Sequence, residues 1–255
     1  MTEDVRLADE LRALGVRRGA TLLVHASLGG TALRAETLRD ALLEVLGGEG
    51  TLVVPAFTPE NSATSSAHLR RVAGLTESER TAFVAAMPAY DPALTPCLGM
   101  GRLAECVRRS EGALRSAHPQ TSFAALGARA RELVEGHPVT SHLGDSSPLG
   151  KLMETGAEEL MINVGFEVCT SFHLAEYRIP DTPLRKYRCV MRGNGRSEWF
   201  EYQDIELDDS DFELIGADFP RMRMREGKLG NAAAMTFSIG DAVDHAVKWM
   251  TEKRR

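Results

Sequence analysis

Two short apolar runs separated by an amphipathic segment constrain the fold of this chain more than any other feature. TLLVH at residues 21–25 and TLVVP at residues 51–55 each predict a buried strand. Residues 35–46, between them, carry a leucine at every fourth position, which is the spacing of a helix with one apolar face. A strand, a helix and a strand within about 35 residues form a βαβ unit with a right-handed crossover. We therefore expect a parallel pair of strands and an α/β fold.

Further elements extend this unit. Residues 5–15 predict a helix that ends at Gly15, and residues 159–165 predict another buried strand. The helix before that strand begins with Ser147 as N-cap and Pro148 at the first helical position.

Two regions depart from the α/β pattern. Residues 60–98 are polar and contain prolines, so they predict a long, partly irregular excursion with a short helix at LTESERTAFVAAM. After residue 185, KYRCVMRG and RSEWFEYQDIEL predict a hairpin around the turn Gly193-Asn194-Gly195. The chain then ends in a predicted helix over residues 240–253, begun by Asp241.

Length and apolar content suit one globular domain. With 43% apolar residues, a chain of 255 can bury a core without disulfides. We predict a single domain over residues 1–255, with a mixed, largely parallel central sheet, flanking helices and a C-terminal β-hairpin region. The four cysteines are scattered, which indicates reduced thiols.

Charge and hydropathy exclude some classes of partner. The formal charge of −6 argues against nucleic-acid binding, which needs a basic surface. No apolar stretch approaches the roughly 18 residues of a membrane span. The acidic N-terminus also lacks the apolar core of a signal peptide. We expect a cytoplasmic protein that binds neither nucleic acid nor membrane; a homodimer is left open.

Three segments resemble known ligand-binding motifs but lack residues or a context that those motifs require. LGDSSPLGKL, at residues 143–152, has the wrong glycine spacing for a phosphate loop and lacks the Ser or Thr after the lysine. The glycine pattern at residues 99–104 does not follow a strand, so it is not a dinucleotide fingerprint. His173 and Glu176 are three residues apart on a predicted helix, but no second such pair completes a metal box, and no metal is expected.

Three polar segments lie at expected strand ends, where α/β proteins bind ligands. They are VHASLGG (24–30), RSAHPQTSFAALG (115–127) and GFEVCTSFHLAEYR (165–178). In the third, Thr170 or Ser171 caps a helix and places His173 in its first turn. There the helix dipole favours a neutral ring, and a carboxylate on the other ring nitrogen would complete a general base. A lone histidine is, however, more often a structural residue.

An acidic run follows, at residues 198–213, with eight acids and no base. The remainder of the chain therefore sums to +2. Such a run is usually a solvated face, but its interleaved aromatic residues anchor it to a core. Asp204, Glu206 and Asp208 alternate as on a strand and would project to one side. A fixed row of carboxylates beside a neutral histidine would suit a polycationic amine as substrate.

At these residues the sequence resembles the aminoglycoside 3-N-acetyltransferase family, whose members transfer acetyl from acetyl-CoA to an amine. The matching stretches run in family order from about residue 5 to residue 250. They include LLVHASL, GTLVVPAFT, YDPALTPCLGMGRLAECVRRSEGALRSAHPQTSFAALG, SPLGKL, GFEVCTSFHLAEYR and ELDDSD. The approach to SPLGKL and residues 60–90 depart from the family pattern.

The resemblance implies a fold particular to this family, with acetyl-CoA as co-substrate in a cleft, and it assigns roles to residues. His173 matches the catalytic histidine, and Glu206 and Asp208 match its downstream acidic partners. The residues that match the CoA-lining segments are Ala26, Ser27, Leu28, Arg115, Ser116, Phe123, Ser147 and Pro148.

The resulting hypothesis is direct acetyl transfer to the 3-amino group of an aminoglycoside, with His173 as general base. Glu60, Asp208 and Asp209 are the expected contacts of substrate ammonium groups, and amides near Ser27 or residues 147–149 the oxyanion donors. A second mechanism passes through an acetyl-enzyme on Cys169. Two other functions stay open: the same chemistry on a non-aminoglycoside amine, such as a biosynthetic intermediate, and non-catalytic binding of a polycation.

Overall fold

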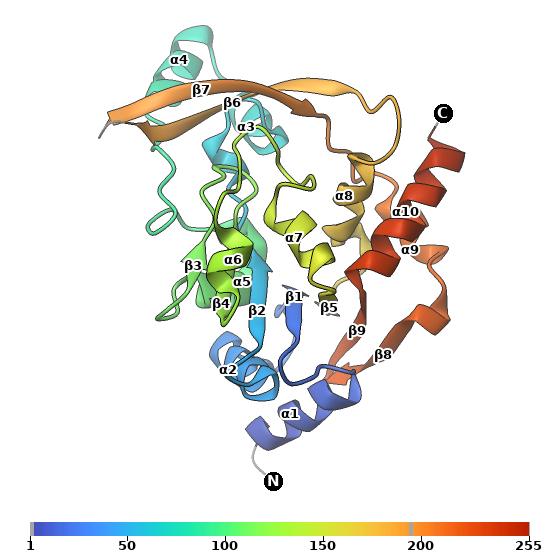
Figure 1. Cartoon of the computed structure of the whole chain (residues 1–255). Coiled ribbons are helices and arrows are strands. Elements are labelled where there is room, and N and C mark those ends of the chain that lie inside the picture. Colours follow the sequence, from blue (N-terminus) through green and yellow to red (C-terminus); the bar gives the residue numbers. More distant parts are fainter. Residues whose placement is uncertain (1–2, 194–195, 255) are drawn as a thin grey trace.

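The central element of the molecule is a mixed β-sheet. A computed structural model describes residues 3–193 and 196–254, and in this part of the chain seven strands follow the order β3-β4-β2-β1-β5-β9-β8 (Figure 1). The strands are β1 (Thr21–Ala26), β2 (Thr51–Pro55), β3 (Leu114–Arg115), β4 (Phe123–Gly127), β5 (Glu158–Ile162), β8 (Met224–Leu229) and β9 (Ala232–Ser238).

The predicted βαβ unit is present. β1 pairs in parallel with β2, with Leu22 opposite Leu52, and in parallel with β5 on its other side. The crossover helix α2 (Ala35–Leu46) has the predicted bounds. The mixed sheet is thus confirmed, but it is not largely parallel: the three central strands are parallel, and the strand pairs outside them are antiparallel because hairpins and short turns connect β3 to β4 and β8 to β9.

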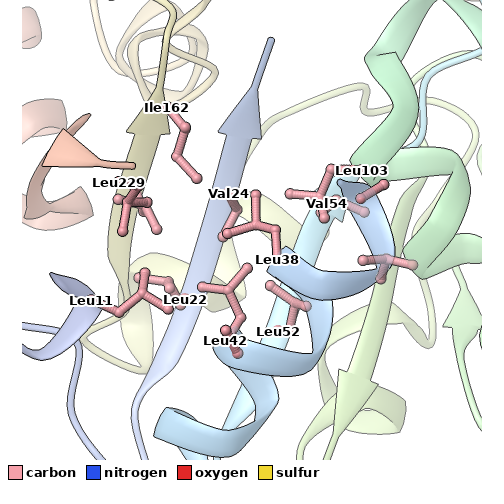
Figure 2. Close-up of a cluster of buried hydrophobic side chains, with 14 of the residues drawn as sticks. Leu11, Leu22, Val24, Leu38, Leu42, Leu52, Val54, Leu103, Ile162 and Leu229 are labelled. Atoms are coloured by element: carbon pink, nitrogen blue, oxygen red, sulfur yellow. The ribbon is translucent and has the colours of Figure 1, made fainter. Parts of the chain in front are cut away.

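Side chains of alternate residues in the central strands pack into two separate hydrophobic cores, one on each face of the sheet. Leu22 and Val24 pack with the first face, which is covered by α1 (Glu3–Ala13), α2 and α5 (Gly101–Arg108) (Figure 2). Leu23 belongs to the second face. The helices over that face are α6 (Ala130–Val134), α7 (Pro148–Glu154), α8 (Ser171–Glu176), α9 (Phe212–Ala217) and α10 (Ile239–Lys253). Burial on both faces explains why these strands are mostly apolar, with His25 of β1 and Glu159 of β5 as buried polar exceptions.

The excursion and the predicted hairpin lie together at one end of the molecule (Figure 1). The excursion holds a short 3₁₀ turn, η1 (Pro59–Asn61), and two helices, α3 (Ser66–Val72) and α4 (Glu77–Ala85). The hairpin strands are β6 (Leu184–Gly193) and β7 (Arg196–Ile205), and bridges join Ser62 to Cys189 and Tyr90 to Met191. Residues 194–195 of the predicted turn lie outside the described residues.

Helix starts show where local signals sufficed. Ser147 caps α7 by accepting a hydrogen bond from the Leu149 amide at 3.1 Å, and Pro148 is the first helical residue, as predicted. α10 begins earlier than predicted, because Ser238 rather than Asp241 is its N-cap and accepts a hydrogen bond from the Asp241 amide.

The sequence analysis did not predict two antiparallel strand pairs. Residues 114–127 form β3 and β4 around a turn, and residues 224–238 form the hairpin β8–β9. The second pair is rich in alanine and charged residues, so it carries little strand propensity and is stabilised by pairing with β5.

Among the described residues, no helix combines the length and apolar character needed to cross a bilayer.

Three buried histidines connect the hairpin to the body. The rings of His137 and His142 each lie 4.7 Å from that of His118, measured between centroids. His142 contacts Asp204 of β7, with 2.7 Å between Nδ1 and Oδ2, and Nε2 lies 3.0 Å from the Tyr202 hydroxyl. Burial lowers the pKa of all three histidines, that of His137 to about 4. Asp204 is therefore inside this cluster and does not belong to an exposed acidic row.

The cluster predicts a loss of stability in mild acid. The pKa of His137 falls from 6.5 in the unfolded chain to about 4 in the folded one, so the unfolded state binds more protons between these values. Its contribution to the free energy of unfolding is complete above pH 6.5 and decreases by about 2 kcal/mol between pH 7 and pH 5. Urea unfolding at both pH values measures this decrease.

His137→Gln should make the decrease smaller, and His245→Gln, on α10 outside the cluster, should not. An identical decrease in wild type and His137→Gln would contradict the assignment.

Candidate active site

A cavity of about 320 Å³ opens at the carboxyl ends of the three parallel strands. His25 and Ala26 of β1 line it, together with Phe57 after β2. The remaining wall includes His173, Asp209 and Phe212 and residues from the start of α5. This is the place expected for a ligand in a sheet of this topology.

His173 lies on α8 and lines the cavity. Aromatic side chains pack against this helix. The preceding 3₁₀ turn η3 (Phe166–Val168) places Phe166 in a stack with Phe172, and Phe172 packs edge-on against Phe212 of α9. Thr170 occupies the N-cap position without a capping hydrogen bond. Since α8 has only six residues, the helix dipole that we expected to act on His173 is short, and the charged side chains around the ring matter more.

The residue that orients His173 is Glu176. Nδ1 of the ring lies 2.6 Å from Oε2 of this carboxylate, which is fully buried. Because a carboxylate only accepts, Nδ1 carries the proton and Nε2 is left as the basic nitrogen. Nε2 is hydrogen-bonded to none of the described residues, and the ring of Phe212 packs 4.7 Å away between centroids.

The second oxygen of Glu176 is also satisfied. Oε1 accepts a hydrogen bond from the Asp208 amide at 3.0 Å and one from Nη1 of Arg254 at 2.7 Å. A buried carboxylate needs such partners, because an uncompensated charge in the interior costs several kcal/mol.

This geometry corrects the predicted partners of the histidine. Glu206 is half exposed, its amide donates to the Pro183 carbonyl, and its carboxylate lies 3.5 Å from Arg185 of β6. β7 ends at Ile205, so the strand alternation that would have aligned Asp204, Glu206 and Asp208 does not continue. Asp208 does lie beside the dyad, through its backbone amide. The i, i+3 spacing of His173 and Glu176 was the available signal for the observed contact.

The candidate ammonium contacts are divided between two cavities. Asp209 lines the cavity of His173, and so does Glu167, which the sequence did not single out. Glu60 lines a second cavity of about 740 Å³, together with Arg70 and Arg71. Hydrogen bonds from Ser210 lower the pKa of Asp208, so its carboxylate is charged at neutral pH.

The residues matched to CoA-lining segments are more dispersed. Ala26 lies in the wall of the His173 cavity, and Ser27 is exposed immediately after it, with its amide donating to Ile162. Leu28 is buried in the core of the first face, and its carbonyl accepts from Arg102 at 2.7 Å.

The other five members of this set are absent from the wall of that cavity. Arg115 donates to the Ala56 and Thr95 carbonyls and to Ser122. Burial lowers its pKa. The remaining four are buried: Ser116 contacts His137, Phe123 packs edge-on against Phe57, and Ser147 and Pro148 begin α7.

Cys169 is unsuited to act as a nucleophile in this structure. Its side chain is fully buried and is absent from the cavity wall. Burial, with the nearby Glu159 carboxylate, raises the pKa of the thiol well above its usual value, so the reactive thiolate is not formed at neutral pH.

A second histidine shares the cavity. Nε2 of His25 lies 3.1 Å from Oε1 of Glu159, a fully buried carboxylate that also accepts a hydrogen bond from Ser171 at the start of α8. His25 was not among the candidate site residues of the sequence analysis. Within residues 3–193 and 196–254, no three His, Cys, Asp or Glu side chains are grouped to hold a metal ion.

Comparisons with known proteins identify the family of this chain. The family model described as aminoglycoside 3-N-acetyltransferase matches residues 23–251. YokD of Bacillus subtilis strain 168, an aminoglycoside N(3')-acetyltransferase-like protein, is 35% identical over 95% of this chain and 90% of its own length. The alignment with the crystal structure of YokD covers 98% of this chain and 94% of the YokD chain, with a TM-score of 0.89.

Two further relatives carry functional names. Aminoglycoside N(3)-acetyltransferase VII of Streptomyces paromomycinus is 34% identical over 97% of this chain and 91% of that protein. AAC-IIIb, solved as a binary complex with CoASH, has a TM-score of 0.84 and 25% identity over 98% of this chain and 96% of its own. On the match of the family model and on this identity over nearly the whole length, the chain belongs to the aminoglycoside 3-N-acetyltransferase family.

Proposed function

We propose that this protein transfers the acetyl group of acetyl-CoA directly to the 3-amino group of an aminoglycoside, with His173 as the general base. Enzymes of this family use acetyl-CoA. The observation that carries the proposal is the buried hydrogen bond between His173 Nδ1 and Glu176, which leaves Nε2 as a basic nitrogen in a cavity.

In this mechanism, Nε2 of His173 removes a proton from the acceptor ammonium, and the free amine attacks the thioester carbonyl. The nitrogen of the tetrahedral intermediate loses its second proton to water, and the intermediate collapses to the amide and expels the CoA thiolate, which takes the proton from the His173 imidazolium and leaves the neutral ring. Glu176 holds the ring in the correct tautomer and stabilises the imidazolium that forms. General-base assistance of this kind contributes about 10²–10⁴-fold to the rate, and the positioning of two bound reactants contributes much of the rest.

The charges of the cavity support an amine as acceptor. Asp209 and Glu167 line the wall near His173, and the charged Asp208 carboxylate is in the same loop as Asp209. These carboxylates would attract the ammonium groups of a polycation and keep one of them within reach of Nε2.

One observation favours the alternative of a non-aminoglycoside amine. The larger cavity is adjacent in sequence to the His173 cavity, because it is lined by the chain neighbours of Phe57 and Gly99, which line the smaller one. Its wall contains two arginines, Arg70 and Arg71, and one acid, Glu60. Two arginines would repel a polycation and would suit an acceptor that also bears an anionic group. Release of CoA in the presence of aminoglycosides, simple polyamines and amino acids distinguishes these acceptors, and no release with any amine would favour a non-catalytic binder.

The base assignment makes a differential prediction about carboxylates. Glu176→Gln should lower kcat by roughly 10²–10⁴-fold, because the amide cannot stabilise an imidazolium. Glu206→Gln should change kcat by less than about threefold, since Glu206 contacts Arg185 at the surface. Steady-state CoA release measures both.

His173→Ala should abolish transfer and leave CoA binding intact by calorimetry. Full activity in His173→Ala, or a larger loss in Glu206→Gln than in Glu176→Gln, would contradict the assignment.

The direct route is tested at Cys169. Cys169→Ala should retain kcat within a fewfold of wild type, because the buried neutral thiol takes no part in transfer. Mass spectrometry of the wild-type protein after incubation with acetyl-CoA alone should detect no acetylated cysteine. A trapped acetyl-enzyme, together with an inactive but folded Cys169→Ala protein, would support the two-step route instead.

A further inference from the structure

Arg254, the C-cap residue of helix α10, contacts the site with its side chain. Its guanidinium contacts three groups, one on α8 and two in the segment between β7 and α9. Nη1 donates to Glu176 Oε1 at 2.7 Å, Nη2 donates to the Asp208 carbonyl at 2.7 Å, and Nε donates to Asp211 Oδ2 at 2.7 Å. A second bond to Asp211 completes a two-pronged pair with that carboxylate.

This arrangement gives the arginine little freedom. Four hydrogen bonds come from the planar fork of donors, and the side chain is 20% exposed. Burial alone would lower the pKa of Arg254, but hydrogen bonds to Asp211 and Glu176 outweigh it and raise the pKa. The guanidinium is therefore a permanent charge in a fixed place.

We propose that Arg254 is a positioning residue for acetyl transfer: it fixes the Glu176 carboxylate against His173 and compensates its charge. The inference rests on the proposed role of His173 as the base. In the described part of the chain, Arg254 is the one arginine or lysine that contacts the Glu176 carboxylate.

The charges around the dyad explain why this compensation is needed. Without Arg254, the surroundings of His173 would be strongly negative, and a negative potential favours the imidazolium over the neutral ring. The carboxylates concerned belong to η3, α8 and the segment between β7 and α9: they are Glu167, Glu176, Asp208, Asp209 and Asp211. His25 lines the same cavity, and His142 interacts electrostatically with His173. Arg254 thus offsets part of this negative charge beside His173.

Both the position of the Glu176 carboxylate and the compensation of its charge depend on this contact. The Asp208 amide holds the same oxygen, but it carries no full charge and lies in the loop that Arg254 itself ties to α10. Loss of the guanidinium would therefore loosen the loop and the carboxylate together.

The test uses the full chain with Arg254→Gln, Arg254→Lys and the matched control Lys253→Gln, an exposed neighbour on the same helix. Arg254→Gln should lower kcat at pH 7 about tenfold, with KM for acetyl-CoA within about twofold, and should move the acidic midpoint of the pH–rate profile up by about one unit. Arg254→Lys should recover part of the loss, since it keeps the charge but not the fork. Lys253→Gln should match wild type.

A second readout does not depend on the acceptor. Proton NMR of the protein without substrate should detect the hydrogen-bonded Nδ1 proton of His173, assigned by its loss in His173→Gln, and the resonance should move or broaden in Arg254→Gln but not in Lys253→Gln. If transfer is absent with every amine, this signal still tests the contact, so failure of the proposed function and failure of this proposal are distinguishable.

Three results would overturn the proposal: an unchanged Nδ1 resonance in Arg254→Gln, an unchanged midpoint and kcat, or a loss that is uniform at every pH and equals the fraction of unfolded protein by circular dichroism. If Arg254→Gln does not fold, Arg254→Lys decides by the same resonance and midpoint.

Discussion

The buried charge of Glu176 is the constraint on which the rest of the site depends. Its carboxylate is fully buried, so it must be compensated on both oxygens, and each partner comes from a different segment. His173 takes one oxygen, and the Asp208 amide and Arg254 take the other. α8, the loop before α9 and the last turn of α10 are therefore fixed relative to one another by a single group. This is the kind of preorganisation that a general base requires.

The sheet supplies the place, and the loops supply the chemistry. Three parallel strands end at one edge, and the cavity opens there because the chain leaves each strand in a different direction. The segments added around that edge differ in charge: Asp209 and Glu167 lie near His173, whereas Arg70 and Arg71 lie in the larger cavity. Acceptor selection is thus expected to depend on the excursion at residues 60–98, and the transfer step on α8.

Prediction from the sequence succeeded where the signal was local. The βαβ unit, the start of α7 at Ser147 and the placement of His173 on a helix after a strand follow from periodicity and capping residues. It failed where pairing decided the structure, as in the alanine-rich β9, which is a strand because β5 and β8 flank it. It also failed for Glu206, because alternation along a strand has no meaning beyond the residue where the strand ends.

By itself, the sequence determined the α/β fold, the helix that carries the histidine and, through resemblance, the family. Those features depend on residues close together in the chain or on motifs that keep their order. Only the tertiary structure decided which acid orients the histidine and what compensates that acid. Glu176 was visible at i+3, but its partner Arg254 is 78 residues further along. No local pattern connects them, since their contact exists only because the packing of α10 on α8 brings the end of the chain to a charge that cannot be buried alone.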